Sequence, residues 1–203
     1  MAKNKRPKAN LVKFELKEEM LKDKEIRTAL IEHIRRRKPA VEKIMEEVRV
    51  HNGNAIADVV AFYKETHCYE IKGQTDSISR LTRQAEIYNQ TFPRVTAVIT
   101  KNHVRWATKN LPEYWGIIVA EAVSENVKLR HIRKAQTNPD FDKKKALMGL
   151  WREELLEIAR DKIEIKTSKK ATRLELASLM GERLKKSETI KSIKAALISR
   201  QPK

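Results

Sequence analysis

Residues 56–73, IADVVAFYKETHCYEIKG, constrain the fold more than any other stretch of this chain. Two apolar runs rich in β-branched and aromatic residues, 56–63 and 67–71, flank the polar triplet KET, and this pattern predicts a β-hairpin. Each run carries an acid where a buried strand normally carries an apolar residue, Asp58 in the first and Glu70 in the second. The two carboxylates in the hairpin therefore indicate a function or a specific set of partners.

The predicted pairing brings the two acids together. A turn at residues 64–66 makes the index sum of opposed residues about 128 to 130, so Asp58 lies across from Glu70 or Lys72. The three residues have the same parity and share one face of the sheet. Carboxylates whose Cβ atoms are about 5 Å apart repel each other in a half-buried site. A divalent cation would turn this repulsion into a binding site, and the alternative is an internal ion pair of Lys72 with either acid.

The segments around the hairpin predict a mixed β-sheet with helices packed on it, an α/β fold with a helical C-terminal extension. Pro39 separates two segments with helical apolar spacing. Asp76 is the expected N-cap of the helix that follows the hairpin. Helices are expected at residues 23–38, 39–50, 76–90, 145–163, 171–186 and 187–199, buried strands at 94–100 and 116–123, and an edge strand at 127–135.

Basic residues outnumber acidic ones by 44 to 27, which gives a formal net charge of +17. The excess lies in the flanks: residues 1–38 carry 13 basic and 6 acidic side chains, residues 39–121 carry 10 of each, and residues 122–203 carry 21 and 11. This distribution favours a polyanionic partner such as DNA, bound by the flanks with release of counterions. The alternative is a solvated, lysine-rich surface.

Nothing in the chain indicates a membrane or an oxidising compartment. A single cysteine, Cys68, excludes an internal disulfide. No stretch approaches the roughly 18 consecutive apolar residues of a membrane span. The basic N-terminus has no apolar core of the secretory kind. We therefore expect a cytoplasmic protein without a membrane partner.

The hairpin and the helix after it together resemble the PD-(D/E)XK nuclease superfamily, the restriction-endonuclease-like fold, and in particular its RecB-like branch. The first acid of that superfamily falls on Asp58, and its (D/E)-x-K element falls on Glu70 and Lys72. The Q-x-x-x-Y element of the RecB-like branch falls on Gln84 and Tyr88. The arrangement looks like a small bacterial and phage-encoded family known mainly from sequence, and it covers about residues 25–121.

The resemblance also implies a metal site. Its ligands would be Asp58, Glu70, the carbonyl of Ile71, and a glutamate of the preceding helix, Glu47, with Glu46 as second choice. The implied cofactor is Mg²⁺, with Mn²⁺ as a substitute. The chain departs from the superfamily pattern at one place, because alanine rather than proline precedes the first acid.

What the resemblance implies is a Mg²⁺-dependent deoxyribonuclease, which hydrolyses phosphodiester bonds with a metal-activated water. Lys72 would position that water, and Gln84 and Tyr88 would orient the lysine, a metal-bound water or a phosphate. Arg80 and Arg83, on the same helix, are candidates for contact with DNA phosphates. Many nucleases of this fold form homodimers. The alternative function is a catalytically inactive DNA-binding or protein-interaction module on the same fold.

Three regions are predicted along the chain. Residues 1–24 would form a basic N-terminal arm, residues 25–140 the nuclease core, and residues 141–203 a basic helical region.

Overall fold

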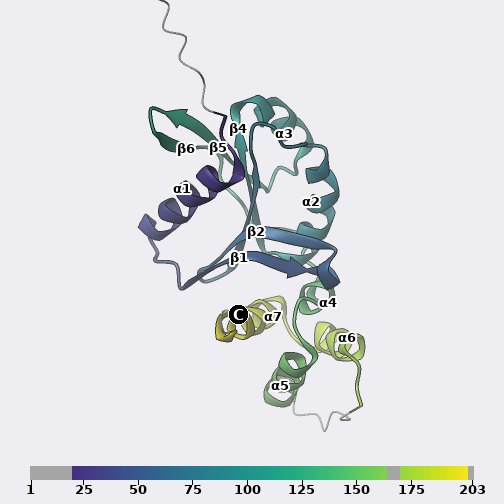
Figure 1. Cartoon of the computed structure of the whole chain (residues 1–203). Coiled ribbons are helices and arrows are strands. Elements are labelled where there is room, and N and C mark those ends of the chain that lie inside the picture. Colours follow the sequence, from purple (N-terminus) through teal and green to yellow (C-terminus); the bar gives the residue numbers. More distant parts are fainter. Residues whose placement is uncertain (1–19, 164–169, 201–203) are drawn as a thin grey trace, which may run out of the picture.

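A computed structural model describes residues 20–163 and 170–200 of this chain, and its strands form one sheet in the order β1-β2-β3-β4-β5-β6 (Figure 1). Strands β1 to β3 are antiparallel to one another, β3 to β5 are parallel, and β6 is antiparallel to β5. The strands are β1 (Lys43–Val50), β2 (Ala55–Phe62), β3 (Thr66–Lys72), β4 (Arg94–Thr100), β5 (Gly116–Val123) and β6 (Asn126–Arg133).

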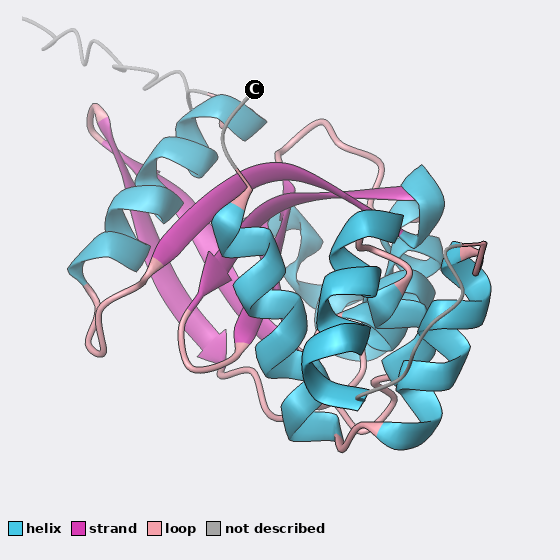
Figure 2. Cartoon of the chain, turned by 90° about the horizontal axis from the view of Figure 1, so that it is seen from below, coloured by secondary structure: helices cyan, strands magenta, loops and turns pink. Residues whose placement is uncertain are grey.

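Helices lie on both sides of this sheet, and a group of helices follows it in the chain (Figure 2). The first three are α1 (Asp23–Arg36), α2 (Arg80–Thr91) and α3 (Val104–Asn110), and the later ones are α4 (Lys143–Leu147), α5 (Arg152–Ile163), α6 (Arg173–Arg183) and α7 (Lys186–Ser199). The predicted fold class, a mixed sheet flanked by helices with a helical C-terminal region, is confirmed. None of the described helices has the length and apolar character needed to cross a bilayer.

Helix α1 covers one face of the sheet. Its buried residues Ile26, Leu30 and Ile34 recur every four positions, which aligns them on one side of the helix. They pack in one cluster with sheet residues that include Val59 and Tyr69. The apolar spacing in the sequence therefore predicted both the helix and its buried side.

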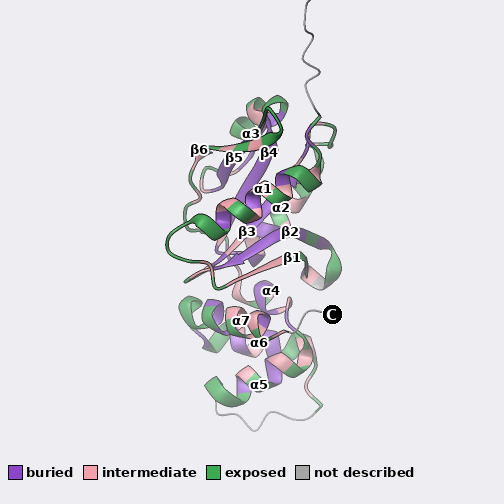
Figure 3. Cartoon of the chain, turned by 60° about the vertical axis from the view of Figure 1, so that its left-hand side comes forward, coloured by how far each residue is buried: buried purple, intermediate pink, exposed green. Residues whose placement is uncertain are grey.

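Helices α2 and α3 cover the other face, and the core on this side continues into the C-terminal helices. Leu81, Ala85 and Tyr88 of α2 are buried in the same cluster as Leu155 of α5 and Met180 of α6. Figure 3 shows buried residues running from the strands into the helices below them. The C-terminal helices thus share an apolar core with the sheet.

The predicted hairpin is confirmed, with its register. Strands β2 and β3 pair antiparallel from Phe62↔Thr66 to Val59↔Tyr69, so opposed residues have an index sum of 128. The predicted strands at residues 94–100 and 116–123 and the edge strand that follows are also present as β4, β5 and β6.

The prediction of a helix at residues 39–50 is wrong, because this segment contains strand β1. The helical spacing of its apolar residues is overridden by pairing with β2, which extends from Lys43↔Phe62 to Val50↔Ala55. Only Val48 and Val50 of the strand are buried, two positions apart as in a strand. The glutamates predicted to lie on a helix therefore lie on the edge strand of the sheet.

Two other local predictions are also wrong. Helix α2 begins at Arg80 with Ser79 as its N-cap, and the Asp76 carboxylate instead accepts a hydrogen bond from the backbone N–H of Gly73. The helix expected at residues 145–163 is interrupted between α4 and α5. Residues 1–19 of the predicted basic arm lie outside the described residues.

Candidate functional site

The candidate site lies where strands β2 and β3 separate. Their ladder stops at the pair Val59↔Tyr69, one position before Asp58 would face Glu70. At this point the Oδ2 atom of Asp58 accepts a hydrogen bond of 2.7 Å from the backbone N–H of Ile71. A side chain therefore takes the place of a backbone partner, and the two acids lie in the opening between the strands.

Asp58 is the more accessible of the two acids, with 20% of its side chain exposed. Arg27 of α1 approaches it from the other face of the sheet. Its Nη1 donates to the Asp58 carbonyl oxygen at 2.8 Å, and its Nη2 lies 3.5 Å from Asp58 Oδ1. Burial and then repulsion from Glu70 raise the pKa of Asp58 to about 7, against the lowering effects of the Ile71 N–H, Lys72 and Arg27.

Glu70 is 1% exposed and is held by three donors. Lys72 Nζ and Gln84 Nε2 donate to its Oε1 atom at 2.5 and 2.6 Å, and the Tyr88 hydroxyl donates to its Oε2 atom at 2.8 Å. Gln84 and Tyr88 lie one helical turn apart on α2 and project from the same side of the helix. The structure therefore brings together all five residues predicted from the hairpin and the following helix, Asp58 included.

The ion pair between Lys72 and Glu70 is one of the two alternatives that the sequence left open. It is buried, with 11% of the Lys72 side chain exposed. In this arrangement Lys72 and Arg27 supply positive charge to the two carboxylates from opposite sides.

The Tyr88 hydroxyl is a hydrogen-bond donor in this site. Burial, together with the nearby Cys68 and Glu70, raises the pKa of its phenol far above the usual value, so the hydroxyl keeps its proton. The hydroxyl also lies 2.8 Å from the carbonyl oxygen of Ile56 in β2. Since it carries one hydrogen, it satisfies one of these two acceptors at a time.

Gln84 leaves one acceptor unused. Its Oε1 atom is buried and has no hydrogen-bond partner among the described residues. An unpaired buried acceptor costs free energy, so this oxygen is suited to a cation or to a bound donor. The oxygen atoms of Asp58, Glu70 and Gln84 are hard donors of the kind that Mg²⁺ prefers, and the donor set therefore fits such an ion.

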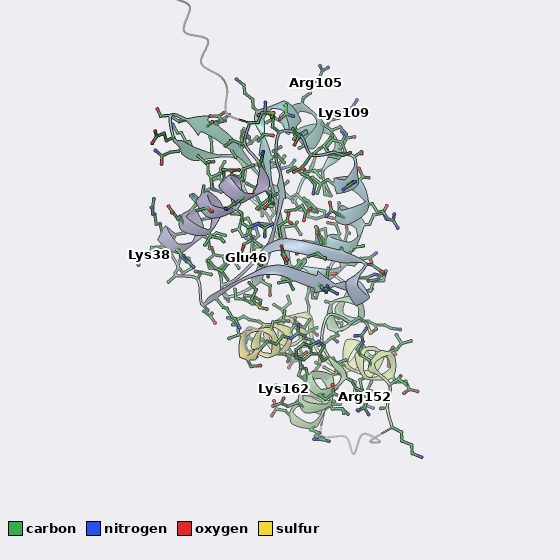
Figure 4. All side chains as sticks on the ribbon, in the orientation of Figure 1. Lys38, Glu46, Arg105, Lys109, Arg152 and Lys162 are labelled. Atoms are coloured by element: carbon green, nitrogen blue, oxygen red, sulfur yellow. The ribbon has the colours of Figure 1, made fainter. Side chains whose placement is uncertain are left out.

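The two glutamates of β1 contribute less than the sequence predicted. Glu47 falls in register with Asp58, between the pairs Glu46↔Val59 and Val48↔Ala57, and has a positive φ of 54°. Its exposed side chain forms no hydrogen bond or ion pair with the rest of the described chain. Glu46, labelled in Figure 4, lies nearer the site, with its carboxylate 3.6 Å from Nη1 of Arg27.

Within residues 20–163 and 170–200, no three His, Cys, Asp or Glu side chains gather in a way that could hold a metal ion. The two acids therefore form a pair, and further ligands would have to be amide, carbonyl or water oxygens.

Arg80 and Arg83 are exposed on α2, in the turn before Gln84, and form no ion pair with a described carboxylate. Arg27 is the site residue that sequence reasoning missed. Its pairing with Asp23 at i, i+4 looks like an ordinary helix-surface pair, and only the packing of α1 on the sheet brings it to Asp58.

Comparison with known proteins gives a family for nearly the whole chain. A family model described as Bacteriophage P4 protein cII matches residues 16–201. "Protein cII" of Enterobacteria phage P4 is 26% identical over 141 residues, which are 69% of this chain and 53% of that protein. This chain therefore spans about half the length of the relative.

A solved structure, "SPO1766 protein of unknown function from Silicibacter pomeroyi", resembles 63% of this chain and 84% of that one, with a TM-score of 0.35 and 16% identity. That likeness is too distant to bear on function.

The family match overturns the assignment to the PD-(D/E)XK nuclease superfamily and its RecB-like branch. The inferred function, a Mg²⁺-dependent deoxyribonuclease, is therefore wrong as well. The terms nuclease and hydrolase do not apply. The reason is that the resemblance depended on a few side chains around one hairpin, whereas the match extends over nearly the whole chain. That the chain is an enzyme, and that Mg²⁺ is its cofactor, stay predictions.

Proposed function

The chain belongs to the family of bacteriophage P4 protein cII, and we propose that it binds the phosphate backbone of DNA beside the Asp58–Glu70 pair, with a divalent cation held by that pair. The observation that carries this proposal is the geometry of the site: the partly exposed carboxylate of Asp58 and the buried carboxylate of Glu70 lie in the opening between β2 and β3, and the buried Oε1 atom of Gln84 beside them has no partner among the described residues. Such a pair gains when a cation offsets its repulsion.

Four oxygen donors would hold the cation: the carboxylates of Asp58 and Glu70, the carbonyl of Ile71 and the Oε1 atom of Gln84. Mg²⁺ is the first choice because all four are hard ligands, and Mn²⁺ is a substitute. When bound, the ion supplies positive charge and a coordination position for a phosphate oxygen. In its absence Arg27 and Lys72 balance the two acids.

The DNA contact is supported by the unpaired arginines of α2. Arg80 and Arg83 are exposed in the turn before Gln84, so a phosphate bound by them lies one turn of helix from the acid pair. Arginine forms bidentate hydrogen bonds with phosphate, and the net charge of +17 favours a polyanion in general.

Several basic side chains of the C-terminal region bind oxygen atoms within the protein itself. Lys143 donates to the Leu184 carbonyl, Lys186 to that of Asn138, and Arg200 binds Glu154 at 2.6 and 2.7 Å. For this reason we place the first DNA contact on α2 rather than on the C-terminal helices. The predicted cytoplasmic location is compatible with a DNA partner. Analytical ultracentrifugation would measure whether the chain forms the predicted homodimer.

Fluorescence anisotropy with a labelled DNA duplex tests the DNA contact. Arg80→Ala/Arg83→Ala should weaken binding and reduce the slope of log K against log salt by about 2, since each phosphate contact contributes about one unit. The matched control is Arg160→Ala/Lys162→Ala, which removes the same charge from exposed positions of α5, where Figure 4 labels Lys162. An equal loss in both double variants, or no loss in the first, would contradict the placement on α2.

Titration calorimetry with MgCl₂ and MnCl₂ tests the cation. The wild-type chain should bind one ion, and Asp58→Asn should abolish this binding while leaving the far-ultraviolet circular dichroism spectrum unchanged. If DNA binding at constant ionic strength is the same in EDTA and in Mg²⁺, the cation has no part in the function. The DNA contact would then be judged on the arginine variants alone.

A further inference from the structure

A second site lies at the other end of the β2–β3 hairpin. The turn of the hairpin, the connection after α1, the start of β4 and the end of β6 enclose a pocket of about 500 Å³. His67 and Tyr69 line it from β3, and their odd numbering places them on the opposite face of the strand from Glu70. The pocket is therefore separate from the acid pair.

The pocket has an excess of positive charge. Its charged side chains are Arg37, Lys38, Lys64, Arg94, Lys134 and a single acid, Glu65. Arg94 binds that acid at 3.0 Å and also donates to the Ala135 carbonyl, so its charge is already balanced.

The four remaining cations form no ion pair within residues 20–163 and 170–200. Arg37, Lys38, Lys64 and Lys134 are exposed, and none forms an ion pair with a carboxylate in the described ranges. Figure 4 labels Lys38, where the chain leaves α1. After burial, the charge of Arg37 contributes to lowering the pKa of His131, which lines the pocket, and of His33 beside it. An anion in this pocket would meet several cations that no carboxylate of the described residues neutralises.

The floor of the pocket is the partly exposed ring of His67, which lies against the buried ring of Tyr69. The rings of His67 and Tyr69 stack with centroids 4.2 Å apart. His67 Nε2 lies 2.8 Å from Thr96 Oγ1, and burial, helped by Arg94 and Arg37, lowers the pKa of His67 to about 3. Its ring is therefore uncharged at neutral pH and offers a flat surface rather than another ion.

One hydroxyl in the pocket is poorly satisfied within the described part of the chain. The hydroxyl of Tyr63 is buried beside Tyr69 and forms no hydrogen bond of ordinary geometry with a described residue. A buried donor left unsatisfied is costly, and a ligand oxygen would remove the cost.

We propose that this pocket binds a phosphate monoester carried by a nucleoside, either a free nucleotide or the 5′-phosphorylated end of a nucleic acid. The doubly charged phosphate would offset the charge of the four unpaired cations, and one of its oxygens would accept a hydrogen bond from the Tyr63 hydroxyl. The partly exposed, uncharged ring of His67 accounts for an attached nucleoside, because a base or sugar packs on an aromatic ring. The volume of about 500 Å³ is within the range of small-ligand pockets. This site does not depend on the cation or on the DNA contact at α2.

Calorimetry on the full chain in EDTA, without phosphate in the buffer, tests the proposal with inorganic phosphate, AMP, and a pentanucleotide with either a 5′-phosphate or a 5′-hydroxyl. We expect AMP or the phosphorylated pentanucleotide to bind with one-to-one stoichiometry. Lys64→Ala/Lys134→Ala should weaken that binding by about tenfold or more, because charge-assisted hydrogen bonds are lost. Tyr63→Phe should weaken it by about threefold or more. Arg105→Ala/Lys109→Ala, at exposed positions of α3, serves as the control and should bind as the wild type does.

The probes also identify the source of the phosphate. Tighter binding of the phosphorylated pentanucleotide than of AMP assigns the pocket to a nucleic-acid end, and the reverse order assigns it to a free nucleotide. The proposal is overturned if no phosphate-bearing probe binds at millimolar concentration. It is equally overturned if the Lys64→Ala/Lys134→Ala variant binds as tightly as the wild type, or if the 5′-hydroxyl pentanucleotide binds as well as the phosphorylated one.

Discussion

The hydroxyl oxygen of Tyr88 lies 2.8 Å from the carboxylate of Glu70 and 2.8 Å from the carbonyl oxygen of Ile56. Helix α2 thereby reaches both strands of the hairpin at the place where their ladder has ended. A single phenol thus helps to hold a buried carboxylate in the opening between β2 and β3.

Tyr88→Phe should lower the free energy of unfolding by about 1–3 kcal/mol, because it leaves a buried carboxylate and a strand carbonyl with one donor fewer. Urea denaturation measures the change. The matched control is Tyr114→Phe, which removes a hydrogen bond of 2.7 Å to Asp140 at an exposed position and should cost less than about 1 kcal/mol. Equal losses in the two variants would mean that Glu70 does not need the phenol.

Lys72→Met should destabilise the fold by about 3–5 kcal/mol, because it leaves the Glu70 carboxylate in a buried site without its cation. The double variant Glu70→Gln/Lys72→Met should recover most of that loss, since it removes both charges. Urea denaturation of the single and double variants measures the coupling.

The control for this pair is Arg36→Met, which breaks an exposed pair with Glu32 on α1 and should change stability by no more than about 0.5 kcal/mol. If the double variant is as unstable as Lys72→Met alone, the buried charge is not the source of the loss.

Asp58 should make stability depend on pH. In the folded chain its pKa is raised from 3.8 to about 7, so between these values the folded protein keeps a proton that the unfolded chain has released. The contribution of Asp58 to the free energy of unfolding should therefore fall as the pH rises from about 4 to about 7, and level off above that. Asp58→Asn removes this contribution, so in EDTA the variant should gain stability relative to the wild type across the window, by on the order of a few kcal/mol.

Urea denaturation of both proteins at a series of pH values measures that difference. A difference that stays constant from pH 4 to 7 would show that the Asp58 carboxylate is ionised in the fold at ordinary acidity.

Lys43 should anchor the C-terminal helix to the sheet. Its Nζ atom on β1 donates to the carbonyl oxygens of Ile198 and Arg200, both at 2.7 Å, at the end of α7 where a cation also complements the helix dipole. Lys43→Met should cost about 1–2 kcal/mol and increase hydrogen exchange in α7. Lys128→Met, at an exposed position of β6, should stay within about 0.5 kcal/mol and leave α7 unchanged.

The local pattern of the sequence predicted the hairpin correctly and the first strand wrongly, because a local pattern reports only contacts between neighbouring residues. The hairpin was predictable because two β-branched runs and a polar turn specify both strands and their register. Residues 43–50 were mistaken for a helix because their apolar residues have helical spacing. Their strand conformation comes from pairing with β2, which the sequence of the segment alone does not show.

The same distinction applies to the assignment of family. The spacing of Asp58, Glu70, Lys72, Gln84 and Tyr88 correctly indicated residues that meet in space. It did not identify the family, because a handful of side chains around one hairpin can recur on chains whose remaining length is unrelated.

By itself the sequence determined that Glu70 and Lys72 share a face and that Asp58 comes near them, since the alternation of a strand and the register of a short hairpin are properties of neighbouring residues. Only the tertiary structure decided that Arg27 lies against Asp58, that the Ile71 N–H binds its carboxylate, and that four unpaired cations surround the pocket beside His67. The first and the last of these join segments far apart in the chain, and the second arises where the ladder of the hairpin ends. Their geometry follows from how helices and strand ends pack on the sheet, and no short-range periodicity encodes it.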